Sequence, residues 1–351
     1  MKQLLQELTG LLGPCGHEHE VARYIAKRIG KVADEVTIDG VGNVIATKHG
    51  VLPGPTLLVS THMDEVGFIV KKIEENGLIR FDKLGGHDDR ILLAQRVRIG
   101  TENGVVPGVI GTISAHMTKF DDPDKVRRHA KLYIDIGASN RQEVEELGVQ
   151  VGDPISWATE LESIGKTRIA GKAFDDRAGC AVLIQALEEL DFSKVNGTVH
   201  AVFSVQEEVG LRGARVAAHQ LPADVALAID TTAVSDTGEE MMDDTLGLGR
   251  GPGIKVMDFS LIASVAVRKK LVSLAKTHDI PYQLEVFSGI GTDAGELFLG
   301  RAGVPTGVLS IPSRYAHSPV EVIDLKDLMY TKDLLVRFIE DFTSDTTFRF
   351  I

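Results

Sequence analysis

Segments with helical and strand-like spacing alternate along most of this chain, and one long β-rich stretch interrupts the alternation once. AGCAVLIQALEEL has the apolar spacing of a helix, TVHAVFSV that of a strand, GARVAAHQL that of a helix and ADVALAID that of a strand. Such an order predicts an α/β fold with a mostly parallel mixed sheet and helices on both faces. Nearer the N-terminus, TLLVSTHMDEVGFIV is apolar enough to form a central strand of that sheet.

The interruption covers residues 71–163, where short strand-like segments are separated by Gly, Asn, Asp and Pro. Because the α/β pattern resumes afterwards, we interpret this stretch as an inserted small β-barrel-like domain. The main domain is then discontinuous and comprises residues 1–70 and 164–351. A chain of 351 residues is long enough for one large and one smaller domain.

Charge and composition exclude several classes of partner. The chain has 38 Lys and Arg against 50 Asp and Glu, a formal net charge of −12, and no basic block with interleaved aromatic residues. Nucleic acid and membranes are therefore not expected as partners. No apolar run is long enough to span a bilayer, and the first twenty residues are too polar for a signal peptide. Two cysteines are too few for a disulfide framework, so we expect a soluble cytoplasmic protein.

Polar side chains gather directly after the predicted strands of the main domain. Parallel strands place functional groups just beyond their carboxyl ends, so such residues are expected to meet. They are His62 and Asp64 after TLLVST, Glu207 and Glu208 after AVFSVQ, Asp230 after VALAI, His317 after VLSIP, and Asp175 and Asp176 in the turn before AGCAVLIQAL.

Imidazole and carboxylate ligands without a thiolate are typical of a hydrolytic centre with two divalent metal ions. Two such ions share one bridging carboxylate. The residue types predict His62 at one ion and His317 at the other. Glu208 and Asp230 would be further ligands, and one Asp of the 175–176 pair would bridge. Zinc is the expected metal, and cobalt and manganese suit the same ligands.

The adjacent glutamates are expected to have different roles. Glu208 would bind metal, while Glu207 would stay free to take the proton of the attacking water as a general base. Asp64 would accept the second ring N–H of His62. Each feature alone is more often structural, as a helix cap, a solvated strand end or a turn. Their coincidence at successive strand ends favours the metal centre.

At these residues the sequence resembles the tetrahedral (TET-type) aminopeptidases, the glutamyl and deblocking family of co-catalytic dimetal peptidases. The matching stretches are THMDEVGF, KAFDDRAG, FSVQEEVGLRGA, ALAIDTT, GTDAGEL and RYAHSPVEV, in the order found in the family. The resemblance implies a zinc-peptidase-like fold and dodecameric tetrahedral assembly, with the inserted β domain forming contacts and a lid.

The resemblance also implies a division of the ligands. His62 and Asp230 would serve one ion, and Glu208 and His317 the other. Asp175 would bridge, joined to Asp176 by a cis peptide bond.

The expected function is a metal-dependent aminopeptidase acting on short peptides. A glutamyl or aspartyl preference requires a fixed cation in the first specificity pocket, for which Arg250, Lys255 and Arg314 are candidates. The alternatives are a broad leucyl-type aminopeptidase, an endoglucanase-like glycoside hydrolase with a carboxylate pair, and a non-catalytic peptide-binding protein on the same fold.

Overall fold

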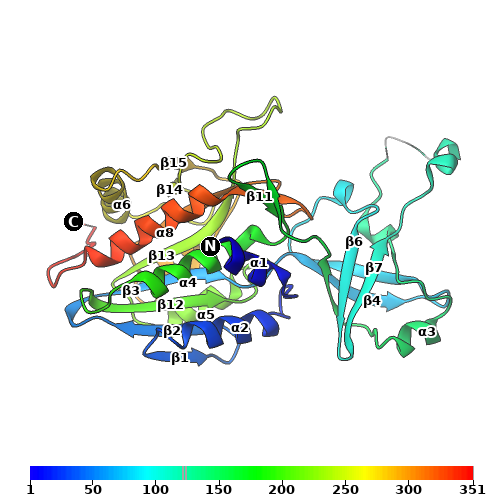
Figure 1. Ribbon diagram of the computed structural model, residues 1–351, viewed down its shortest axis with the longest axis horizontal. Helices are drawn as coiled ribbons and strands as arrows, with labels where there is room; N and C mark the ends of the chain where they lie inside the picture. The colour runs from blue at the N-terminus through cyan, green and yellow to red at the C-terminus, as the bar shows by residue number, and fades with distance from the viewer. Residues whose placement is uncertain (121, 123–124, 351) are drawn as a thin grey trace.

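The computed structural model describes residues 1–120, 122 and 125–350 and has two parts (Figure 1). One part is a large sheet with helices, and the other is a small β-barrel at one end of it. The predicted α/β fold with a separate barrel-like unit is therefore confirmed. Residues 121, 123 and 124 of the expected insertion lie outside the described residues.

The α-helices are α1 (Lys2–Gly10), α2 (His19–Ile29), α3 (Arg141–Glu146), α4 (Phe174–Glu189), α5 (Arg212–Gln220), α6 (Val265–Thr277), α7 (Ala294–Phe298) and α8 (Leu325–Glu340). Most helices belong to the part with the large sheet, and α3 lies between two strands of the barrel. None of them, within the described residues, is both long and apolar enough to cross a bilayer.

The large sheet is mixed, with its parallel strands at the centre. Its strands are β1 (Glu35–Ile38), β2 (Val44–His49), β3 (Leu52–His62), β10 (Glu162–Ile164), β11 (Arg168–Gly171), β12 (Asn196–Ser204), β13 (Val225–Ala233), β14 (Gly253–Met257), β15 (Gln283–Val286), β16 (Thr306–Arg314) and β17 (Glu321–Asp324). In the order β1-β2-β12-β3-β13-β16-β17-β11-β10, the central strands β12, β3, β13 and β16 are parallel. On both sides of this centre the pairing is antiparallel, and short connections join β1 to β2 and β10 to β11. β14 and β15 lie off this path: β14 pairs with β16 antiparallel and with β15 parallel.

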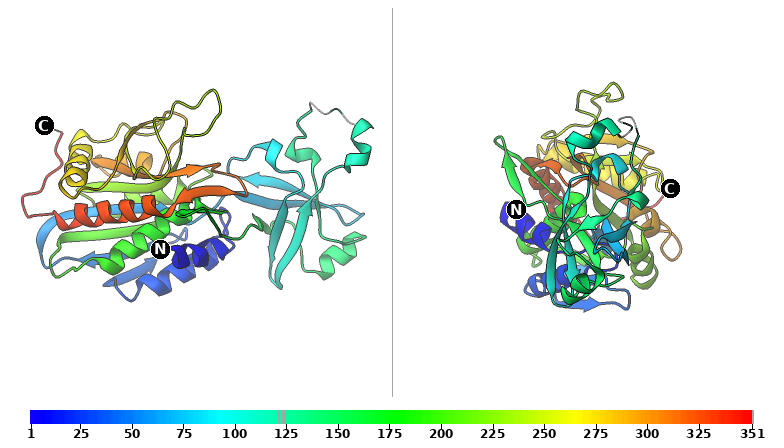
Figure 2. Two further views of the ribbon diagram at one scale, coloured as in Figure 1. Left: turned by 45° about the horizontal axis from the view of Figure 1, so that its top comes forward. Right: turned by 90° about the vertical axis from the view of Figure 1, so that its right-hand side faces the viewer.

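Helices cover both faces of the sheet (Figure 2). The side chains of β3 alternate between the faces: Leu57 and Val59 pack in the core that contains α1, α2, α4, α6 and α8, whereas Leu58 packs in a smaller core with α5 and α7. A strand that packs against a core on each face is apolar at successive positions, which explains the apolar run at residues 57–59.

The barrel has its own hydrophobic core. Its strands are β4 (Gly67–Ile73), β5 (Ile79–Leu84), β6 (Arg96–Thr101), β7 (Gly104–Ile110), β8 (Ile134–Asp135) and β9 (Pro154–Trp157), closed in the order β4-β5-β8-β7-β6-β9. The ring of Phe68 makes edge-to-face contacts with Phe81 and Trp157, with centroids 5.0 Å and 4.9 Å apart.

The segment TLLVSTHMDEVGFIV is divided between the two parts rather than forming one central strand. β3 ends at His62, and β4 of the barrel begins at Gly67. The apolar residues continue on both sides of this break, so the sequence pattern does not reveal it. The consequence is that His62 and Asp64 lie where the chain passes from the sheet to the barrel.

Candidate metal centre

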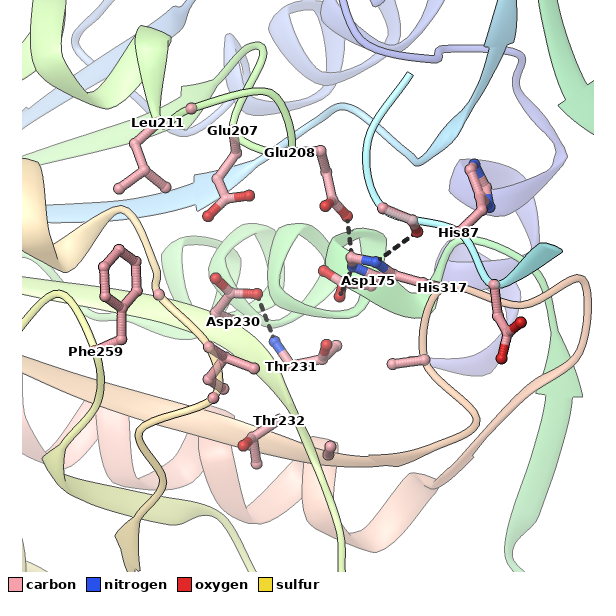
Figure 3. Close-up of a pocket in the computed structure, with 18 residues that line it drawn as sticks. His87, Asp175, Glu207, Glu208, Leu211, Asp230, Thr231, Thr232, Phe259 and His317 are labelled. Atoms are coloured by element: carbon pink, nitrogen blue, oxygen red, sulfur yellow. Dashed lines mark hydrogen bonds and ion pairs between the residues drawn. The ribbon is translucent and has the colours of Figure 1, made fainter. Parts of the chain in front are cut away.

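The carboxyl ends of the central parallel strands meet beside a cavity of about 560 Å³ (Figure 3). All seven residues expected at the site lie close together there: His62 at the end of β3, Asp64 just after it, Asp175 at the start of α4, Glu207 and Glu208 after β12, Asp230 near the end of β13, and His317 after β16. Their meeting follows from the parallel register of these strands, since equivalent ends lie at one edge of the sheet.

Asp175 lies between the two histidines. Its Oδ1 is 3.0 Å from Nε2 of His62, and its Oδ2 is 3.4 Å from Nε2 of His317. Each carboxylate oxygen thus faces a different imidazole, an arrangement suited to a bridging ligand.

Asp176 has different partners. It is fully buried and accepts hydrogen bonds from the Thr61 hydroxyl, from His62 N at 3.3 Å and from Gly179 N at 3.0 Å. The peptide bond between Asp175 and Asp176 is cis, as the family resemblance implies. The two adjacent acids therefore face different surroundings, and Asp175 is the one beside both histidines.

Two groups of ligand atoms share Asp175. The first contains His62, Asp175 and Asp230, with 3.7 Å between His62 Nε2 and Asp230 Oδ1. The second contains Asp175, Glu208 and His317, with 3.1 Å between His317 Nε2 and Glu208 Oε1. Within each group the ligand atoms lie within 4.8 Å of one another. The group His62, Glu207 and Glu208 also meets this distance, so Glu207 lies next to both groups.

The loop that carries both glutamates is held by buried carboxylates. Gln206, with φ of +54°, donates its N–H to Glu18 Oε1 at 3.1 Å. The next two amides, of Glu207 and Glu208, donate to the two oxygens of Asp64 at 3.0 Å and 3.2 Å. Because β12 has already ended at Ser204, the strand alternation no longer applies, and both glutamate side chains point into the cavity (Figure 3).

Asp64 also lies behind His62. His62 Nδ1 is 3.2 Å from the main-chain oxygen of Asp64 and 3.4 Å from its Oδ1. A hydrogen bond from Nδ1 leaves Nε2 free to bind a metal. Asp64 therefore contacts both the first histidine and the loop of the glutamates, and only the first of these contacts was expected from the sequence.

Two further acids, which were not expected from the sequence, hold the backbone around the site. Glu18 holds the glutamate loop, and Glu321 accepts backbone N–H groups of Asp175 and His317. Glu321 belongs to the stretch RYAHSPVEV. Nothing in that pattern separates a buried acid at a strand start from a solvated one.

The site buries more negative charge than its own side chains neutralise. Burial raises the pKa of Asp230 to about 7 and that of Glu207 well above its usual range, and neighbouring acids add to both shifts. Burial lowers the pKa of His62, but the charge of Glu207 and the hydrogen bond with Asp175 outweigh it, so that this pKa stands well above its usual range.

Positive charge is therefore favoured at this position. Among the described residues, Glu208 Oε1 is a buried atom without a hydrogen-bond partner, and it faces His317. A divalent cation would supply both the missing charge and the missing contact. The residues present thus fit metal ions with oxygen and nitrogen ligands.

The similarity to known proteins extends over nearly the whole chain. Residues 42–334 match the model of the M42 glutamyl aminopeptidase family. An aminopeptidase from the archaeon Desulfurococcus kamchatkensis is 42% identical, with a TM-score of 0.93 over 98% of this chain and 95% of that one. The TET1 peptidase of Pyrococcus horikoshii, which can assemble into a tetrahedron or a large octahedral shell, is 34% identical, with a TM-score of 0.87 over 96% of this chain and 98% of that one.

A structure from Thermotoga maritima described as an endoglucanase is 35% identical, with a TM-score of 0.78 over 96% of both chains. The fold is thus shared by proteins with different names, and the family model decides between them because it covers most of this sequence. With that match, and with histidines and carboxylates gathered at the ends of its parallel strands, the chain belongs to the M42 glutamyl aminopeptidase family of peptide-bond hydrolases.

Proposed function

We propose that this protein removes the N-terminal residue from short peptides with two divalent metal ions and Glu207 as the general base. The observation that carries the proposal is the position of Asp175, with one oxygen towards each histidine. One ion would be held by His62, Asp175 and Asp230, and the other by Asp175, Glu208 and His317. When bound, such ions polarise the carbonyl of the first peptide bond and lower the pKa of a water molecule.

Glu207 is the residue best suited to move the proton. Its side chain lines the cavity, is 8% exposed, and has Oε2 4.0 Å from His62 Nε2. It takes a proton from the attacking water at a carboxylate oxygen and delivers it to the nitrogen of the leaving amine. Burial raises the pKa of Glu207, which favours holding the proton between these two steps.

The cations expected for an acidic preference have partners away from the cavity. Arg250 pairs with Asp244 at 2.6 Å, and Arg314 pairs with Asp236 at 2.7 Å. Lys255 is fully buried 3.3 Å from both Asp258 and Glu285. None of the described residues that line the cavity is Lys or Arg.

One wall of the cavity is uncharged and partly apolar. Leu211 and Phe259 lie at the side opposite His87 (Figure 3), and Ile290 and Thr232 are also among the residues that line the cavity. An acidic side chain there would face the carboxylates of the site without a compensating cation. We therefore propose that the enzyme is of the broad leucyl type and accepts uncharged, apolar first residues.

A panel of peptides tests both proposals. Leu-Gly-Gly is expected to lose its first residue with a kcat/KM at least about tenfold above that of Glu-Gly-Gly, which is the scale of discrimination by an apolar pocket. N-acetylated Leu-Gly-Gly and soluble cellulose are expected to remain intact.

Phe259→Ala should lower kcat/KM for Leu-Gly-Gly about tenfold and for Ala-Gly-Gly less, because only the larger leucine side chain reaches the position of the removed ring.

Phe350→Ala is the matched control, since Phe350 is fully exposed and does not line the cavity. A higher kcat/KM for the glutamyl peptide would contradict the leucyl preference. Hydrolysis of the acetylated peptide would contradict an aminopeptidase.

We further propose that twelve copies assemble into a tetrahedron, with residues 71–163 as the domain that forms contacts and residues 1–70 and 164–351 as the catalytic domain. The barrel extends from one end of the molecule (Figure 1), and the similar TET1 peptidase can form a tetrahedron. Light scattering is expected to give twelve times the chain mass of 38.0 kDa. A monomeric mass at micromolar concentration would refute this assembly.

A further inference from the structure

Glu321 holds together the two loops that carry Asp175 and His317. It is the first residue of β17 and is 1% exposed. Its Oε2 accepts a hydrogen bond from Asp175 N, and its Oε1 accepts one from His317 N, both at 3.0 Å. From these contacts we propose that Glu321 is a positioning residue, which sets the metal affinity of the site by fixing the backbone of two ligands. The proposal rests on the proposed function, because it takes Asp175 and His317 as ligands.

The sheet topology explains why one side chain reaches both loops. β17 lies between β16 and β11, with Glu321 opposite Gly171 and Val322 opposite Arg314. The chain runs from β11 towards Asp175 and from β16 towards His317. A residue at the start of β17 therefore lies where both ligand loops leave the sheet.

Both loops contain a residue that needs outside support. Ala173 has φ of +56° and His317 has φ of +60°. A left-handed conformation is unfavourable for residues with a Cβ atom and persists where the surroundings fix it. The bonds to Glu321 lie at His317 itself and two residues after Ala173, so they are well placed to hold both conformations.

The contacts of Glu321 show that it has a different role from the residues that would touch metal or substrate. Both of its oxygens are engaged by backbone N–H groups, and it is not among the described residues that line the cavity. Its effect on the ions must therefore pass through the orientation of Asp175 and His317. Partners of this kind change metal affinity without binding the metal.

The test is a titration of the metal-free protein with cobalt. Calorimetry gives the cobalt affinity, and the absorption spectrum reports the surroundings of the bound cobalt. Glu321→Gln retains the size of the side chain but places an NH₂ group against one of the two backbone N–H donors. We expect cobalt affinity to fall about ten- to a hundredfold, with an altered absorption band. Circular dichroism should show a folded variant.

Asp327→Asn is the matched control. Asp327 is fully buried, and its two oxygens accept N–H groups of Gly249 and Gly251 at 2.7 Å and 2.8 Å, so the same chemistry is lost away from the ligand loops. The control should bind cobalt as the unmodified protein does.

Unchanged cobalt affinity in Glu321→Gln would overturn the proposal, and so would an equal loss in both variants, which would indicate general destabilisation. A protein that binds cobalt but releases no N-terminal residues would contradict the proposed function instead, and the difference between the two variants would still decide the role of Glu321.

Discussion

Removal of divalent ions with a chelator is expected to reduce peptide hydrolysis to the level of a buffer blank, and added zinc, cobalt or manganese is expected to restore it. The reason is the excess of buried carboxylates at the site. The carboxylate oxygens of Asp175 lie 3.0 Å and 3.4 Å from the two histidines, and none of the described residues that line the cavity is Lys or Arg. Without ions, neither the polarisation of the peptide carbonyl nor the activation of water is available.

Thermal unfolding provides a second readout of the same experiment. Ions that bind only the folded state stabilise it by about 2.7 kcal/mol when their free concentration is a hundred times the dissociation constant. The metal-free protein should therefore unfold at a lower temperature. Calcium is the control ion, because it prefers six to eight oxygen ligands and the two histidines do not suit it.

An assay on polysaccharide after chelation tests the alternative of a glycoside hydrolase. A glycoside hydrolase needs two carboxyl groups on either side of one bond and no metal ion. Cellulose hydrolysis that survives chelation, together with peptide hydrolysis that is absent throughout, would favour that alternative and refute the metal centre.

The central part of the fold could be predicted from the sequence because its signals are local. The alternation of helical and strand-like segments depends only on neighbouring residues, and it correctly indicated parallel strands with helices on both faces. The sequence did not show that the chain passes into a second core between His62 and Gly67, because apolar residues lie on both sides of the polar residues there. Apolar spacing records burial, and it does not record which core a residue is buried in.

The candidate site shows the same division between local and distant information. His62, Glu208 and Asp230 could be proposed because each comes shortly after an apolar run in the sequence. The contact between Glu321 and Asp175 joins residues 146 positions apart, and no local pattern reveals it. Asp175 and Asp176 are identical in type, and only the path of the backbone separates their surroundings.

Replacement of Glu207 by Gln should lower kcat about a hundred- to ten-thousandfold, the usual contribution of a general base. Gln has nearly the same shape, but its amide cannot take a proton from water at neutral pH. The backbone N–H of residue 207 would still donate to Asp64, so the loop should keep its conformation. The two metal ions should remain bound, since the proposed ligands are unchanged. Metal content by atomic emission and kcat on Leu-Gly-Gly are the measurements.

Glu208→Gln is the matched control, because it makes the same chemical change one residue away. Glu208 Oε1 lies 3.1 Å from His317 Nε2 in the second ligand group, so its replacement should cost one bound ion per chain as well as turnover. The comparison matters because His62, Glu207 and Glu208 also lie close enough to form a ligand group of their own. If Glu207→Gln loses an ion while Glu208→Gln retains both, the two roles are reversed. If Glu207→Gln retains full activity, proton transfer must be assigned to another residue.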